Sequence, residues 1–127
     1  MEKIKLTEIQ FSNIVNSNFD ENFWFFELGR VEDLDGTDVD NEFLTDFYSK
    51  GINLWENYKG KIAELICDTD NKIPKEWVND LITGDIRNFI TTLLTLLVST
   101  YSIELSLAIP LVALALKHDI KNFCKEI

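Results

Sequence analysis

The chain has few of the residues that interrupt helices. Its 127 residues include only 2 prolines and 5 glycines. A fold built from many short strands needs more of both, because tight turns use them. The shortage therefore favours long helices over an all-β fold. Hydrophobic residues make up 46% of the chain, which is enough for one core, so we expect a single helical domain over residues 1–127.

Cysteine is also scarce, with only Cys67 and Cys124 in the sequence. The two residues are far apart and lack the close spacing of a zinc or redox motif. No apolar run of the kind found in a secretion signal follows Met1. We therefore expect a cytoplasmic protein with two free, buried thiols, and a disulfide bond between them is the alternative.

Basic residues are outnumbered by acidic ones, 12 against 22, and the formal net charge is −10. The acidity is concentrated in residues 20–46, where 10 acids face one base, Arg30. Such a surface repels nucleic acids and anionic membranes and attracts basic proteins. We expect a basic partner protein and no direct nucleic-acid binding.

Helical spacing of apolar residues and capping signals predict six helical segments. Thr7 and Gln10 form a capping box at the start of the first one. Gly29 is placed to end the second, Gly51 to bend or break the third, and Pro110 to bend or divide the last. The predicted segments are 7–15, 20–28, 40–67, 75–82, 85–101 and 102–125.

The longest apolar stretch is 89–116, which holds 28 residues and one charge, Glu104. As one helix it would be about 42 Å long, against about 30 Å for a bilayer core. Folded back near Ser102, each arm would be about 21 Å long, which is short for a membrane helix and suitable for a small bundle. We therefore predict an all-α fold, a compact bundle of four to six helices around this buried helical hairpin. Insertion of the stretch into a membrane is the alternative.

Residues 31–42 resemble the calcium-binding loop of an EF-hand. Asp33, Asp35 and Glu42 fall on its ligand positions three, five and twelve. However, Val31 takes the first ligand position and cannot coordinate, and Asp38 replaces the usual apolar residue. We therefore expect a solvated acidic loop before the next helix and no metal site.

Residues with catalytic potential are few. The single histidine, His118, has no nucleophile motif beside it, and with Cys124 it does not complete a zinc site. Neither a glycine-rich phosphate loop nor a serine nucleophile motif is present. We therefore expect no enzyme activity and no cofactor.

The remaining hypothesis is a non-catalytic protein-binding module, such as a small inhibitor, an immunity-type protein or an accessory subunit. The aromatic run 23–26 and the acidic loop after it would together contact a basic partner protein. A membrane-associated protein that inserts residues 89–116 is the alternative. The predicted partner-binding residues are Trp24, Phe25, Asp33, Asp35, Asp38 and Asp40.

Overall fold

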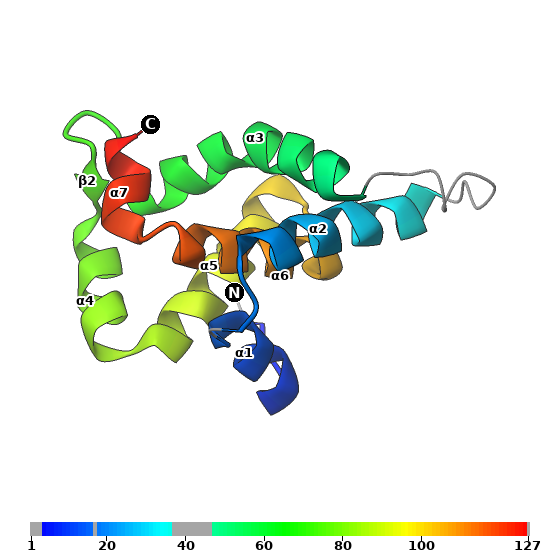
Figure 1. Cartoon of the computed structure of the whole chain (residues 1–127). Coiled ribbons are helices and arrows are strands. Elements are labelled where there is room, and N and C mark those ends of the chain that lie inside the picture. Colours follow the sequence, from blue (N-terminus) through cyan, green and yellow to red (C-terminus); the bar gives the residue numbers. More distant parts are fainter. Residues whose placement is uncertain (1–3, 17, 37–46, 127) are drawn as a thin grey trace.

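The structure is a computed structural model that describes residues 4–16, 18–36 and 47–126, with the backbone alone for 32–36 and 82–83. The predicted all-α class is confirmed, with seven helices and one small antiparallel strand pair in this part of the chain (Figure 1). The elements are α1 (Glu8–Val15), α2 (Glu21–Gly36), α3 (Phe47–Ile66), β1 (Cys67–Asp68), β2 (Ile73–Pro74), α4 (Glu76–Gly84), α5 (Ile86–Tyr101), α6 (Leu105–Lys117) and α7 (Ile120–Lys125).

The predicted helix starts agree with the capping contacts. The Thr7 hydroxyl accepts a hydrogen bond from the Gln10 amide at 3.1 Å, and the Gln10 side chain accepts one from the Thr7 amide at 2.9 Å. Asp85 accepts from the Asn88 amide at 3.1 Å and so begins α5. Each contact satisfies an amide that has no partner inside its own helix. The long third helix is confirmed over Phe47–Ile66, whereas residues 40–46 lie outside the described residues.

The last predicted helical segment is divided, but not at Pro110, which lies inside α6. The division comes at Asp119, whose backbone has φ 60 and ψ 110 and whose side chain accepts from the Lys121 amide at 3.3 Å. Proline removes one hydrogen bond to the residue four positions earlier. Here that residue is Ser106, which is exposed to solvent, so α6 continues through the proline. This division raises the number of helices above the predicted four to six.

Helix α6 forms the centre of the core. Eight of its 13 residues are buried, and it contacts α1, α2, α3, α5 and α7 (Figure 1). A helix that is apolar on all sides has to be enclosed by protein or lipid. Its partner α5 contributes the fully buried Phe89, Leu93, Leu94 and Leu97. The apolar stretch therefore forms two packed helices, as predicted.

In the described parts of the chain, no helix is both long enough and apolar enough to cross a membrane. Helix α5 has 16 residues and α6 has 13, against about 20 apolar residues needed to cross a bilayer.

Helices α2 and α3 cross at two glycines. A Cβ atom added to Gly29 would overlap the carbonyl oxygen of Phe47, and one added to Gly51 would overlap that of Phe25. Glycine allows such an approach because it has no side chain. The prediction that Gly29 ends α2 is therefore wrong, since the helix continues to Gly36, and Gly51 does not break α3. Residues 31–36, predicted as the start of an acidic loop, are the last turns of α2.

Replacing Gly51 by alanine should lower the free energy of unfolding by about 1–3 kcal/mol, because the added methyl group forces the two backbones apart. Gly60→Ala is the matched control, since Gly60 is on the same helix and nothing lies within 4 Å of its added Cβ. That change should raise stability by up to about 1 kcal/mol. Denaturant unfolding of both variants checks this, and equal effects of the two substitutions would contradict the glycine crossing.

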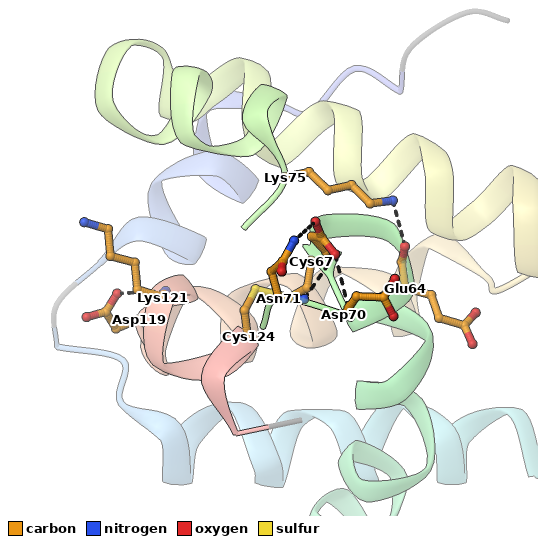
Figure 2. The surroundings of a disulfide bond; sticks show 9 residues. Glu64, Cys67, Asp70, Asn71, Lys75, Asp119, Lys121 and Cys124 are labelled. Atoms are coloured by element: carbon orange, nitrogen blue, oxygen red, sulfur yellow. Dashed lines mark hydrogen bonds between the residues drawn. A yellow bond between two sulfur atoms is a disulfide. The ribbon is translucent and has the colours of Figure 1, made fainter. Parts of the chain in front are cut away.

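A disulfide bond joins Cys67 in β1, directly after α3, to Cys124 in α7, with a Cα–Cα distance of 5.6 Å (Figure 2). The expectation of two free thiols is therefore wrong. The sequence could not reveal this pairing, because the cysteines are 57 positions apart and meet only when α7 packs beside β2. Both residues are buried, at 2% and 0% exposure.

The turn between β1 and β2 is held by the side chain of Asp68. It accepts hydrogen bonds from the amides of Asp70 at 3.1 Å and Asn71 at 3.3 Å, and from the Asn71 side chain at 2.9 Å. These bonds to Asn71 hold the pKa of the Asp68 carboxyl below its ordinary value. Beyond the turn, the Lys75 ammonium donates to the Glu64 carbonyl at 2.9 Å and ties the strand pair back to α3 (Figure 2).

Reduction of the disulfide should lower the free energy of unfolding by about 4 kcal/mol, because the reduced, unfolded chain regains the freedom of a 57-residue loop. Denaturant unfolding with and without a phosphine reductant measures the difference. The variant Cys67→Ser/Cys124→Ser should not respond to the reductant. Superimposable curves for the native chain would show that this bond contributes nothing.

Candidate functional site

The aromatic run on α2 is divided between the core and the surface. Trp24 and Phe25 are buried, at 3% and 8% exposure, whereas Phe23 and Phe26 are exposed, at 36% and 45%. Helical geometry explains this division, because Trp24 and Phe25 lie one turn before the fully buried Leu28. Two predicted partner-binding residues, Trp24 and Phe25, therefore lie in the core. Once Leu28 is known to be buried, helical spacing places Phe23 and Phe26 on the exposed side of α2.

We use the name aromatic patch for the exposed Phe23, Phe26 and Tyr48. The ring of Phe26 packs edge-on against Phe47 of α3, with 5.4 Å between centroids, and Tyr48 packs in the same way on Phe25 at 5.9 Å. Tyr48 is 39% exposed. These contacts restrict the rings of Phe26 and Tyr48, so a partner that covers these two rings loses little rotamer entropy.

The predicted acidic residues lie at the other end of α2. Asp33 and Asp35 belong to its last turn, where only the backbone is described, while Asp38 and Asp40 lie outside the described residues. That last turn contains no basic residue. The C-terminal end of a helix carries a partial negative charge, to which these carboxylates add. The negative potential should therefore be strongest at this end of α2.

Arg30, the one base of this acidic segment, is already paired. Its Nε donates to Glu27 Oε2 at 3.2 Å, and its Nη2 forms a second bond to Glu27 Oε1. The hydrogen bonding to Glu27 raises the pKa of the Arg30 guanidinium above its ordinary value. Arg30 therefore neutralises a neighbour on its own helix rather than the acids at the helix end.

The EF-hand interpretation does not fit the backbone. Residues 31–36 are helical in α2, whereas the first half of a calcium loop has to wrap around the ion. The described residues contain no group of three or more His, Cys, Asp or Glu side chains that could hold a metal ion.

A pocket of about 290 Å³ lies behind the aromatic run, between α1, α2 and α6. We call it the Trp24 pocket; its lining is partly polar and consists of Gln10, Asn13, Phe23, Trp24, Glu27, Val31, Ser106, Ile109 and Pro110. The indole Nε1 of Trp24 is buried and has no hydrogen-bond partner among the described residues. A buried donor without a partner costs about 1–3 kcal/mol.

His118 is part of a packed aromatic cluster. Its ring stacks on Trp55, with centroids 5.4 Å apart and planes inclined by 3°, and its Nε2 lies 3.4 Å from Glu21 Oε2. A cavity of about 260 Å³ adjoins this stack, and its described lining contains no hydroxyl or thiol group. The imidazole therefore links the end of α6 to α3 and to the start of α2.

A further pocket of about 440 Å³ lies between the N-terminal segment and α5. The basic residue in its lining, Arg87, forms a bidentate ion pair with Glu8 at 2.9 and 3.2 Å. Its guanidinium carbon lies 4.0 Å from the centroid of the Phe11 ring. The same contacts with Arg87 lower the pKa of the Glu8 carboxyl. These groups dock α1 onto α5 and satisfy each other, which makes this pocket a weaker candidate for function.

Searches of protein-family models, curated proteins and solved structures gave no match to this chain. A functional assignment therefore rests on the residues described above.

Phe25 and Phe26 offer a matched test of the division on α2. Phe25→Ala should lower the free energy of unfolding by about 3–5 kcal/mol, because it empties a core position. Phe26→Ala should cost about 1 kcal/mol or less, because that ring is largely exposed. Denaturant unfolding distinguishes the two, and similar losses would mean that Phe26 is also a core residue.

Proposed function

We propose that the chain is a non-catalytic protein-binding module that captures a basic partner protein through α2 and the start of α3. The observation that carries this proposal is the acidic last turn of α2, which contains no basic residue. The aromatic patch lies on the same pair of helices, α2 and α3. The C-terminal end of α2 and the first turns of α3 lie together at one end of the molecule, away from α4 and α7 (Figure 1).

The placement of these acids costs the isolated protein stability. Helices usually carry Lys or Arg near their C-terminal ends, and a carboxylate there is unfavourable by about 0.3–1 kcal/mol. A partner that places basic side chains against Asp33 and Asp35 would relieve this repulsion. Residues that destabilise the folded chain locally are expected at functional sites.

The aromatic patch supports the same proposal. Exposed rings on a rigid helix pair are typical anchors of protein interfaces, and surrounding charges mainly set association rate and specificity. A nucleic acid does not suit this surface, because its phosphates would meet carboxylates. The partner is therefore expected to be a protein with a basic rim around an apolar centre.

The compartment is a related proposal. Disulfide bonds persist in oxidising compartments and are rare in the reducing cytosol. The Cys67–Cys124 bond therefore favours an oxidising compartment over the cytoplasm expected from the sequence. The membrane-inserting alternative draws no support from the buried side chains of α5 and α6.

The binding proposal predicts a salt-dependent interaction. A protein captured from the native host should be basic, and its purified form should bind about tenfold or more weakly to a variant with Asp33, Asp35, Asp38 and Asp40 all changed to Asn. The salt dependence of the affinity should fall as well, because fewer charges are involved. Titration calorimetry at several salt concentrations measures both.

Two single substitutions complete this test. Phe26→Ser should weaken capture because it removes an anchor ring from the aromatic patch. Ile73→Ser is the matched control, since Ile73 is 53% exposed and lies in β2, away from α2. Affinity unchanged in the charge variant, or an equal loss in the Ile73 control, would reject the proposed surface.

A further inference from the structure

Helix α7 is the shortest helix in the described part of the chain, and it has few ties to the other elements. Its six residues, Ile120–Lys125, are too few to form a stable helix alone. It packs beside β2 and the end of α6. Within the described residues, no hydrogen bond or ion pair joins a side chain of α7 to another element, and its cap is the neighbouring Asp119.

Packing and one covalent bond hold α7 in place. Ile120 and Phe123 are buried, and the ring centroids of Phe123 and Trp55 lie 5.8 Å apart. Cys124 is fully buried and bonded to Cys67 (Figure 2). Two buried apolar side chains do not offset the entropy lost when a six-residue helix and its linker become ordered. The disulfide bond therefore supplies the stabilisation that packing lacks.

The residue between α6 and α7 favours release of α7. Asp119 has φ 60 and ψ 110, a conformation that residues with a side chain rarely adopt. Such a backbone persists only where surrounding contacts impose it, and it relaxes when they are lost. Helix α6 ends at Lys117, before this residue, so α7 can leave without unwinding α6.

The Cys67 side of the bond is held independently of α7. The Lys75 amide donates to the Ile66 carbonyl at 2.8 Å, and the Lys75 ammonium donates to the Glu64 carbonyl at 2.9 Å (Figure 2). The Asp68 side chain holds the turn between β1 and β2. Cutting the bond therefore leaves Cys67 in place and frees α7 alone.

We propose that the Cys67–Cys124 bond is a redox-operated latch, whose reduction releases α7 while the other helices stay folded. A dithiol supplies the two electrons. Its thiolate attacks one sulfur of the bond, and the other sulfur leaves as a thiolate and takes up a proton. The second thiolate of the reagent then attacks the mixed disulfide, closes a cyclic disulfide and releases the remaining cysteine, which takes up the second proton. This inference does not depend on the proposed partner.

Release of α7 changes the surface beside Trp55. Phe123 moves away from the Trp55 ring, and Cys67 loses its covalent neighbour. In an oxidising compartment α7 stays docked, whereas in a reducing one the chain exposes the apolar side chains of α7 and those it covered. The latch therefore gives one sequence two surfaces, and the redox state selects between them.

Hydrogen exchange followed by NMR tests the latch on the intact chain, with and without dithiothreitol. The Phe123 amide, which donates to the Asp119 carbonyl at 2.9 Å, should exchange about tenfold faster or more after reduction. Amides in the middle of α5 and α6 should keep their protection. The indole signal of Trp55 should shift, whereas that of Trp24 should stay in place.

Thiol labelling gives a second readout. In the reduced chain, Cys124 should react with iodoacetamide within about threefold of the rate of a peptide of residues 119–126, which has the same sequence but no fold. The variant Cys67→Ala/Cys124→Ala should show the fast exchange of the reduced chain whether or not dithiothreitol is present. Phe123→Ala with the bond intact is the matched packing variant, and it should speed the exchange of the Cys124 amide less than reduction does.

Three results would overturn the latch. Exchange of the Phe123 amide unchanged by reduction, or Cys124 labelling more than about tenfold slower than in the peptide, would show that packing alone keeps α7 docked. Loss of protection in α5 and α6 together with α7 would mean that the bond supports the whole fold. An effect of Phe123→Ala equal to that of reduction would assign the hold on α7 to packing.

Discussion

The close crossing of α2 and α3 is the contact on which the rest of the structure depends. Gly29 and Gly51 bring each helix against a backbone carbonyl of the other, Phe47 and Phe25 respectively. Beside this crossing, Phe25 of α2 is buried and Phe26 is exposed. The crossing therefore sets the separation of the two helices that carry the aromatic patch.

Helix α6 supplies the second constraint. Because most of its circumference is apolar, it has to be covered on most sides, and five other helices provide that cover. Two of them, α1 and α2, leave the Trp24 pocket where they meet α6. The disulfide bond fixes α7 to β1, directly after α3, and so closes the assembly opposite the acidic end of α2 (Figures 1 and 2). The disulfide-linked α7 and the acidic end of α2 thus lie at opposite ends of the molecule (Figure 1).

The proposed function follows from local features that do not serve folding. A core indole without a hydrogen-bond partner, carboxylates at the negative end of a helix and exposed phenylalanines each cost stability or solubility in the isolated chain. Under the proposed function, a basic partner would cover the phenylalanines and neutralise the carboxylates.

Local interactions were readable from the sequence. The capping box at Thr7, the cap at Asp85 and the pairing of the apolar stretch into two buried helices were all predicted, because they depend on residues a few positions apart or on composition. The acidity of residues 20–46 is likewise a property of the sequence alone.

Long-range contacts were decided only by the tertiary structure. Gly29 has the pattern of a helix end, yet α2 continues past it, and only the nearby carbonyl of Phe47 explains why this position is glycine. The burial of Trp24, the unpaired indole and the pairing of Cys67 with Cys124 likewise require knowing which helices meet. The sequence by itself determined where helices begin and where charge accumulates. The packing of those helices determined which aromatic rings are exposed, because burial depends on neighbours that are distant along the chain.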